Sequence, residues 1–141
     1  MQVLGDDVLP NDVVVSQTNL QWTMAADMEF GTKDPLPLIH FGPNCFYRPI
    51  AERALAEAGI AYYTSFECES SHAVAEAISA GLGVALIDAY NVREDHVEWT
   101  HPAVEPDDTE LVHVVRTDRR VRTAAVRALV DELEAALGVS E

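Results

Sequence analysis

The chain has 141 residues and carries 24 Asp and Glu against nine Lys and Arg, a formal net charge of −15 at pH 7. A surface this acidic repels nucleic-acid phosphates and anionic lipid headgroups, so we expect no direct nucleic-acid contact and no membrane contact by this chain. The length fits one domain, no apolar run is long enough to span a bilayer, and the start lacks the basic n-region of a signal peptide.

The N-terminal part of the chain contains short extended runs separated by turns. Gln2–Leu4 and Val13–Val15 are strand candidates, and Leu20–Ala26 is a stronger one. Asp27–Pro37 contains Gly31 and two prolines, so it is predicted to be a loop.

Strand and helix patterns then alternate. The predicted elements are strand Leu38–Phe41, helix Phe46–Ala58, strand Ile60–Cys68, a helix with its apolar face on Ala73, Val74, Ala77 and Ile78, and strand Val84–Ile87. Asn44 is expected to cap the first helix, and Ser70 or Ser71 the second. Gly59 is expected to end the first helix, and Gly81 and Gly83 the second through positive φ angles.

After Asp88 the pattern loosens. Val97–Thr100 is predicted to be a brief strand, His101–Thr109 a loop and Leu111–Arg116 a strand. A last helix, Arg119–Leu137, is expected to be capped by Thr117 or Asp118. Its predicted apolar stripe consists of Val121, Ala125, Ala128, Leu129, Leu133 and Ala136.

This order of elements predicts an α/β fold with a mainly parallel sheet. Residues 37–101 are expected to form a complete subdomain. The segments 1–26 and 111–141 are expected to form part of a second one, so that 1–141 make a single ligand-binding domain.

Cys45 is the strongest candidate for covalent chemistry. It starts a helix, where free N–H groups lower a thiol pKa, and His40 lies at the end of the preceding strand as a possible base. Cys45 and Cys68 are the two cysteines and form no C-x-x-C pair, which favours a reducing cytoplasm. The alternative interpretation of Cys45 is a half-buried residue without chemistry.

No cofactor motif and no tight metal-ligand spacing occurs, so we expect no cofactor and no metal. Asp95, His96, Glu98 and His101 are metal-capable, but their spacing is more typical of a solvated loop. Glu67 and Glu69 are two apart in a predicted extended segment and should face the same side, toward solvent.

Two strand-to-helix turns are the best candidates for binding a ligand. Gly42–Cys45 and Cys68–Ser71 each follow a strand and open a helix, so both should lie at the carboxyl edge of a parallel sheet. Their polar groups could instead serve only as helix caps.

The segment PLPLIHFGPNCFYRPIAERALAEAGIAYYTSFECESSHAVAEAISAGLGVALID resembles the effector-binding domain of LysR-type transcriptional regulators. The likeness lies in the order of a PLPL strand, an arginine-containing helix, an extended strand and the AGLGVAL element. It implies two Rossmann-like subdomains of three layers, similar to type 2 periplasmic binding proteins, with a small-molecule effector in the cleft between them. The winged helix-turn-helix that binds DNA in this family, and most of the first subdomain, have no counterpart in this sequence.

The resemblance implies a non-enzymatic sensor of a small molecule that forms a homodimer. The ligand-binding residues it implies are Gly42, Pro43, Asn44, Cys45, Glu69, Ser70 and Ser71. Glu67 and Glu69 would repel a carboxylate, so a neutral or cationic effector is expected. A small solute-binding protein, a thiol enzyme using Cys45 and a remnant without ligand remain alternatives.

Overall fold

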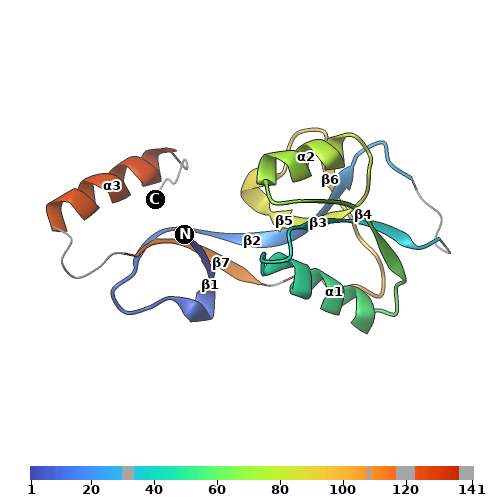
Figure 1. The fold of residues 1–141 in the computed structure, drawn as a ribbon, viewed down its shortest axis with the longest axis horizontal. Helices are drawn as coiled ribbons and strands as arrows, with labels where there is room; N and C mark the ends of the chain where they lie inside the picture. The colour runs from blue at the N-terminus through green and yellow to red at the C-terminus, as the bar shows by residue number, and fades with distance from the viewer. Residues whose placement is uncertain (30–33, 108, 117–122, 137–141) are drawn as a thin grey trace. The chain divides into compact units, whose positions relative to one another are not determined.

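The computed structural model describes residues 1–29, 34–107, 109–116 and 123–136 (Figure 1). The chain divides into two compact units, the first made of Met1–Asn19 with Asp108–Glu141 and the second of Leu20–Asp107. Strand β2 (Val13–Ala25) contributes to both. The sequence places Leu20–Ala26 with the terminal segments, whereas in the structure this stretch belongs to the second unit, where β2 pairs with β5 and β6.

Three parallel strands form the centre of the second unit. β3 (Leu36–Phe41) pairs in parallel with β4 (Tyr62–Cys68). Leu38 of β3 forms a parallel bridge with Val84, which immediately precedes β5 (Ala85–Asp88). β2 is antiparallel to both β5 and β6 (His96–Glu98), so the parallel part of the sheet is confined to β3, β4 and β5.

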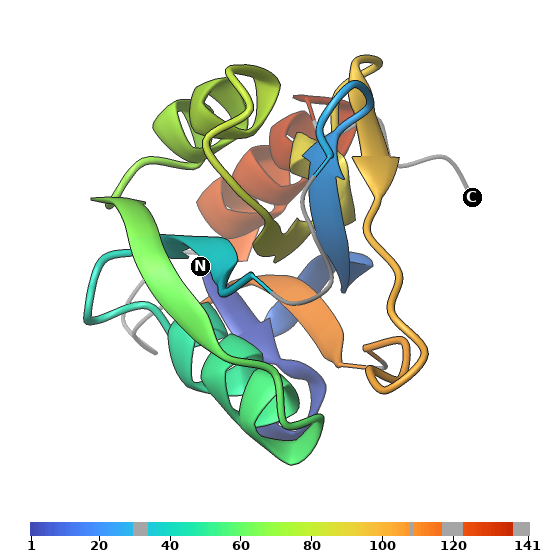
Figure 2. The same ribbon diagram turned by 90° about the vertical axis from the view of Figure 1, so that its right-hand side faces the viewer.

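Two helices cover opposite faces of this layer, as Figures 1 and 2 show. α1 (Tyr47–Glu57) contacts β3 and β5, and α2 (Ser71–Ser79) contacts β3 and β4. Leu55 of α1 and Ile78 of α2 are fully buried, and burial of each contributes roughly 1.5–3 kcal/mol. Both helices are confirmed as predicted, because the apolar spacing that marks them in the sequence is the face that packs on the sheet.

The glycines that follow these helices have different roles. Gly59 and Gly81 have φ angles of 70° and 76° and end α1 and α2 as predicted. Gly83 has no positive φ, so that part of the prediction is wrong. A Cβ on Gly83 would instead lie 2.5 Å from the Pro37 carbonyl oxygen and 2.8 Å from Ser65 Oγ, so glycine is needed there for close approach.

The first unit contains a small antiparallel sheet. β7 (Glu110–Val115) lies between β1 (Gln2–Leu4) and residues 13–19 of β2. The two strands predicted at Val13–Val15 and Leu20–Ala26 are one continuous strand, because the polar residues between them still pair with β7. Ser16 Oγ lies 3.0 Å from His113 Nδ1 across that pair.

Helix α3 (Thr123–Ala136) packs within the first unit. Val126, Val130 and Leu133 contact Val15 and Val115, and Val130 is buried. The predicted stripe is therefore wrong except at Leu133, since its other described members are exposed: Ala125, Ala128, Leu129 and Ala136. Val121 and the expected caps Thr117 and Asp118 lie outside the described residues. No helix of the described segments is long and apolar enough to cross a membrane.

An ion pair fixes the turn between β1 and β2. Arg116 donates from Nε to Asp12 Oδ1 at 2.7 Å and from Nη2 to Oδ2 at 2.6 Å. The Leu9 N–H also donates to Asp12 Oδ2, at 2.8 Å. The guanidinium lowers the pKa of Asp12 from 3.8 to about 2. The turn is thereby tied to the end of β7.

Asp12→Asn should lower the stability of the first unit at neutral pH, because it removes the negative charge and one of the two acceptor oxygens of this bidentate pair. A carboxyl whose folded pKa is depressed contributes stability above its unfolded pKa and loses it as the pH falls toward its folded value. The contribution of Asp12 should therefore vanish between pH 3.8 and about 2. Urea unfolding of wild type and variant over this pH range measures the difference. Asp6→Asn, at an exposed position nearby, is the control, and equal effects of both variants would contradict the assignment.

Candidate functional site

The two predicted turns lie side by side at the carboxyl edge of β3 and β4. Phe41 and Cys68 are paired in the last register position of these strands, so Gly42 and Glu69 follow next to each other. A Cβ on Gly42 would lie 2.6 Å from Glu69 Cγ and 2.9 Å from its Oε1. The Glu69 side chain therefore lies over Gly42, and the seven residues of the predicted site come from two adjoining turns.

The turn before α1 is held by its own backbone. The Cys45 N–H donates to the Gly42 carbonyl at 3.0 Å, and the Arg48 N–H to the Cys45 carbonyl at 3.3 Å. The N-cap of α1 is Phe46, without a side-chain cap, so the prediction that Asn44 caps this helix is wrong. Asn44 lies two residues before the N-cap, too early to reach the first N–H groups. Its exposed amide, next to Pro43, can meet a ligand.

The turn before α2 is capped as predicted. Ser70 Oγ accepts the Ala73 N–H at 3.3 Å, and Cys68 Sγ donates to the Ser70 carbonyl at 3.5 Å. Ser71 is the first residue of α2 and is exposed. Of the two serines, Ser71 therefore has the hydroxyl that is not used as the cap, and it lies beside the N–H groups of the first turn.

The environment of Cys45 opposes thiol chemistry. Burial is the largest effect and raises the pKa of the thiol above its ordinary value of 9.0. A hydrogen bond from the Tyr47 N–H lowers this pKa by less than burial raises it, and the carboxylate of Asp88 raises it further. His40 is buried, and its Nε2 has no hydrogen-bond partner in the described part of the chain. Burial also lowers the pKa of His40. The expected thiol–imidazole pair is therefore not formed.

Arg48 lies in the first turn of α1, close to the first of the two turns, and its charge is engaged. It donates from Nη1 to Glu67 at 2.5 Å and from Nε to Glu52 at 3.0 Å. The Tyr62 hydroxyl donates to the second oxygen of Glu52 at 2.8 Å. The hydrogen bonds from Tyr62 and Arg48 together lower the pKa of Glu52. Glu67 and Glu69 are both exposed, as predicted, although the Glu67 carboxylate also pairs with Arg48.

Two further carboxylates remain at this edge. Glu69 is exposed above Gly42, whereas Asp88, at the end of β5, is buried and accepts a hydrogen bond from Asn91 Nδ2. The electrostatic character of the edge is therefore acidic, which disfavours an anionic ligand.

His96, one of the metal-capable residues of the predicted loop, stabilises the fold. His96 is buried, its Nε2 lies 2.9 Å from Ser79 Oγ, and its Nδ1 accepts the Arg93 N–H at 3.1 Å. A hydrogen bond with Ser79 also lowers the pKa of Asp95. These contacts attach β6 to α2. In the described segments no three His, Cys, Asp or Glu side chains are arranged to hold a metal ion.

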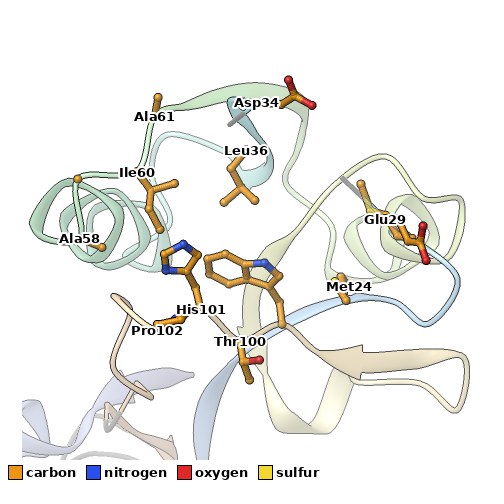
Figure 3. A pocket seen from close by; sticks show the side chains of 13 residues that line it. Met24, Glu29, Asp34, Leu36, Ala58, Ile60, Ala61, Thr100, His101 and Pro102 are labelled. Atoms are coloured by element: carbon orange, nitrogen blue, oxygen red, sulfur yellow. The ribbon is translucent and has the colours of Figure 1, made fainter. Parts of the chain in front are cut away.

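A cavity of about 890 Å³ lies at the opposite edge of the same sheet (Figure 3). Its walls include Met24, Leu36, Ile60, Trp99 and His101, and none of the seven predicted site residues lines it. The sequence gives no signal for this cavity, because its walls come from segments that carry no common motif.

Comparisons with known proteins bear on the family and the fold of this chain. Residues 13–138 match the family model of the LysR substrate binding domain. The HTH-type transcriptional regulator YofA of Bacillus subtilis (strain 168) is 32% identical over 103 residues, which cover 69% of this chain and 35% of YofA. The chain thus spans about a third of the length of this curated relative.

Solved structures of low sequence identity show the same fold. The apo regulatory domain of HypT from Salmonella typhimurium matches with a TM-score of 0.69 at 18% identity, covering 96% of this chain and 72% of that one. DarR of Vibrio fischeri, in complex with DNA, matches with a TM-score of 0.65 at 15% identity, covering 99% and 50%. The expected α/β fold of the periplasmic-binding-protein type is confirmed.

The raised pKa of Cys45 predicts slow alkylation. In a Cys68→Ser variant, the rate of reaction with iodoacetamide should stay below that of free cysteine at pH 8 and rise with an inflection above pH 9.0, because only the thiolate reacts. A pH–rate profile followed by mass spectrometry measures this. An inflection well below pH 9 would show an activated thiol and revive the enzyme hypothesis.

Proposed function

This chain belongs to the family of LysR substrate-binding domains, and from that premise we propose that it binds a small-molecule effector at the carboxyl edge of β3 and β4. The resemblance inferred from Pro35–Asp88 is confirmed by the family model and by YofA. The observation that carries the proposal is the adjacency of the two strand-to-helix turns, with Glu69 lying over Gly42.

The binding residues that we propose are the seven residues of these turns. Asn44 and Ser71 offer exposed polar side chains, and the first turn of α2 offers N–H groups. Gly42 makes room for the Glu69 side chain at this edge, and Pro43 and Cys45 complete the wall. Ser70 contributes through its backbone, because its hydroxyl caps α2.

The charges at this edge support a neutral or cationic effector. Glu69 and the buried Asp88 supply negative charge, and the guanidinium of Arg48 is committed to Glu52 and Glu67. A carboxylate effector would meet this negative potential without a free cation among the described residues of the two turns. A polar molecule carrying an amine or no charge fits better.

Two structural relatives have a small ligand bound, which supports a small-molecule effector for this chain. The regulatory domain of HypT has a bromide-bound form, and that of Synechocystis CcmR is in complex with 2-PG. At 17% and 12% identity these ligands do not transfer to this chain, whose edge has its own charges.

We further propose that the protein acts in the cytoplasm, without catalysis, as the sensory part of a regulator whose DNA contacts come from another segment or chain. The second unit would be the complete ligand-binding subdomain and the first unit part of the other one. The unactivated Cys45 supports a sensor over a thiol enzyme.

A thermal-shift screen of metabolites sorted by charge tests the proposed site. Hits should be neutral or cationic, and a hundredfold excess over Kd should raise Tm by roughly 10 °C, because about 2.7 kcal/mol of binding free energy stabilises the folded state. Asn44→Trp, which fills the first turn, should abolish the shift, whereas Ala56→Trp on the exposed side of α1 should not. Hits confined to anions, or equal shifts in both variants, would contradict the proposal.

We also propose a homodimer formed through a free sheet edge. Among the described strands β4 pairs only with β3, and Tyr63 on it is 53% exposed. An outer strand with an exposed aromatic side chain is suited to pairing with a second copy.

Tyr63→Lys should shift the protein toward the monomer, because a lysine on an edge strand opposes pairing by another chain. Light scattering over a range of protein concentrations measures the shift. Leu82→Lys replaces a comparably exposed apolar residue away from this strand and should leave the mass unchanged. A wild-type protein that stays monomeric at every concentration would rule out the dimer.

A further inference from the structure

The cavity at the amino edge of the sheet has an apolar, aromatic interior. Leu36 is buried at the start of β3, and Ile60 follows the turn that ends α1. Figure 3 shows both side chains pointing into the cavity from one side and His101 entering from the other. Trp99, which is 7% exposed, also lines it. Its volume of about 890 Å³ is in the usual range for small-molecule sites.

Backbone hydrogen bonds hold the walls in place without a ligand. The Ile60 N–H donates to the Leu55 carbonyl at 3.0 Å, which closes the end of α1, and the Leu36 N–H donates to the Ala61 carbonyl at 2.8 Å. The Trp99 N–H donates to the Trp22 carbonyl at 2.9 Å. The Trp22 and Trp99 rings also pack edge to face, with centroids 5.4 Å apart. A preformed site of this kind avoids part of the ordering cost of binding.

His101 provides one oriented polar group. Its Nδ1 accepts the Ala103 N–H at 3.0 Å, so in the neutral ring the proton is on Nε2. This Nε2–H has no hydrogen-bond partner among the described residues. The ring lies 6.0 Å from that of Trp99 at an interplanar angle of 30°. The cavity therefore combines a flat aromatic wall with an oriented hydrogen-bond donor on His101.

Among the described residues that line the cavity, charged side chains occur only at the rim. Glu29 and Asp34 are exposed, and in Figure 3 their carboxylates lie away from Ala58 and Ile60 and turn outward from the centre. The last turn of α1 also presents the negative end of its helix dipole on this side. Both features disfavour anions, whereas the interior carries no charged side chain to repel an apolar molecule.

We propose that this cavity is a second small-molecule site, separate from the proposed effector site, and that it takes a flat aromatic molecule, neutral or cationic, with one hydrogen-bond acceptor directed at His101. The aromatic part stacks against Trp99 and contacts Leu36 and Ile60. The acceptor receives the His101 Nε2–H.

Prodan, a neutral naphthalene ketone, is the probe, because its emission moves to the blue in an apolar site and back to the red when its carbonyl accepts a hydrogen bond. Titration should give saturable blue-shifted emission and quench tryptophan fluorescence, since Trp99 lines the cavity. Ala58→Phe, which fills the cavity, should weaken binding by about tenfold or more. Ala56→Phe, on the exposed side of the same helix, should not.

Two further variants test the donor and the location. His101→Phe should retain binding with emission further to the blue, and His101→Gln, which can donate again, should restore the red component. Asn44→Trp should leave prodan binding unchanged, so the result does not depend on the effector site. The proposal is overturned if prodan does not saturate, if Ala58→Phe and Ala56→Phe bind alike, if His101→Phe leaves the emission unchanged, or if Asn44→Trp removes binding.

Discussion

The close approach of β5 to β3 determines the arrangement of the second unit. Val84 donates its N–H to the Pro37 carbonyl at 2.9 Å and accepts the Ile39 N–H at 2.8 Å. A side chain on Gly83 would lie 2.5 Å from the same carbonyl oxygen, so these bonds need glycine there. They join the parallel pair of β3 and β4 to the antiparallel pair of β5 and β2. Because the resulting layer is continuous, α1 and α2 can each bury an apolar face on it, and both edges of the sheet acquire fixed positions.

The sequence predicts those parts of the fold that depend on local patterns. α1 and α2 follow from apolar residues at helical spacing and from glycines that end them, and both features are contained within about 12 residues. The sequence pattern divides β2 into two predicted strands, which is wrong, because the polar segment after Val15 pairs with a strand about 97 positions later. α3 has small apolar residues on more than one face, so its spacing admits two stripes. Contact with Val15 and Val115 decides between them in favour of Val126, Val130 and Leu133.

The candidate site, like the fold, can be predicted from the sequence only in part. That the two turns meet follows from the sequence, since parallel strands end at one edge and each is followed by a helix. What the turns can do chemically does not follow, because it depends on side chains that meet only in the folded chain. Burial raises the pKa of Cys45, where the sequence predicts activation, and the Glu67 carboxylate pairs with Arg48. The amino-edge cavity had no sequence signal, because Leu36, Ile60 and Trp99 are adjacent only in space.

The polarity of the helices explains why the two edges of one sheet differ in chemistry. At the carboxyl edge α1 and α2 begin, so this edge presents N–H groups without helical partners and exposed polar turns. At the amino edge α1 ends, and its last carbonyls are satisfied by Gly59 and Ile60, whose N–H groups donate to Ala56 and Leu55. With its polar groups thus paired, the end of the helix presents mainly apolar side chains. The polar effector proposed at one edge and the aromatic ligand proposed at the other therefore both follow from the same strand-helix-strand connection.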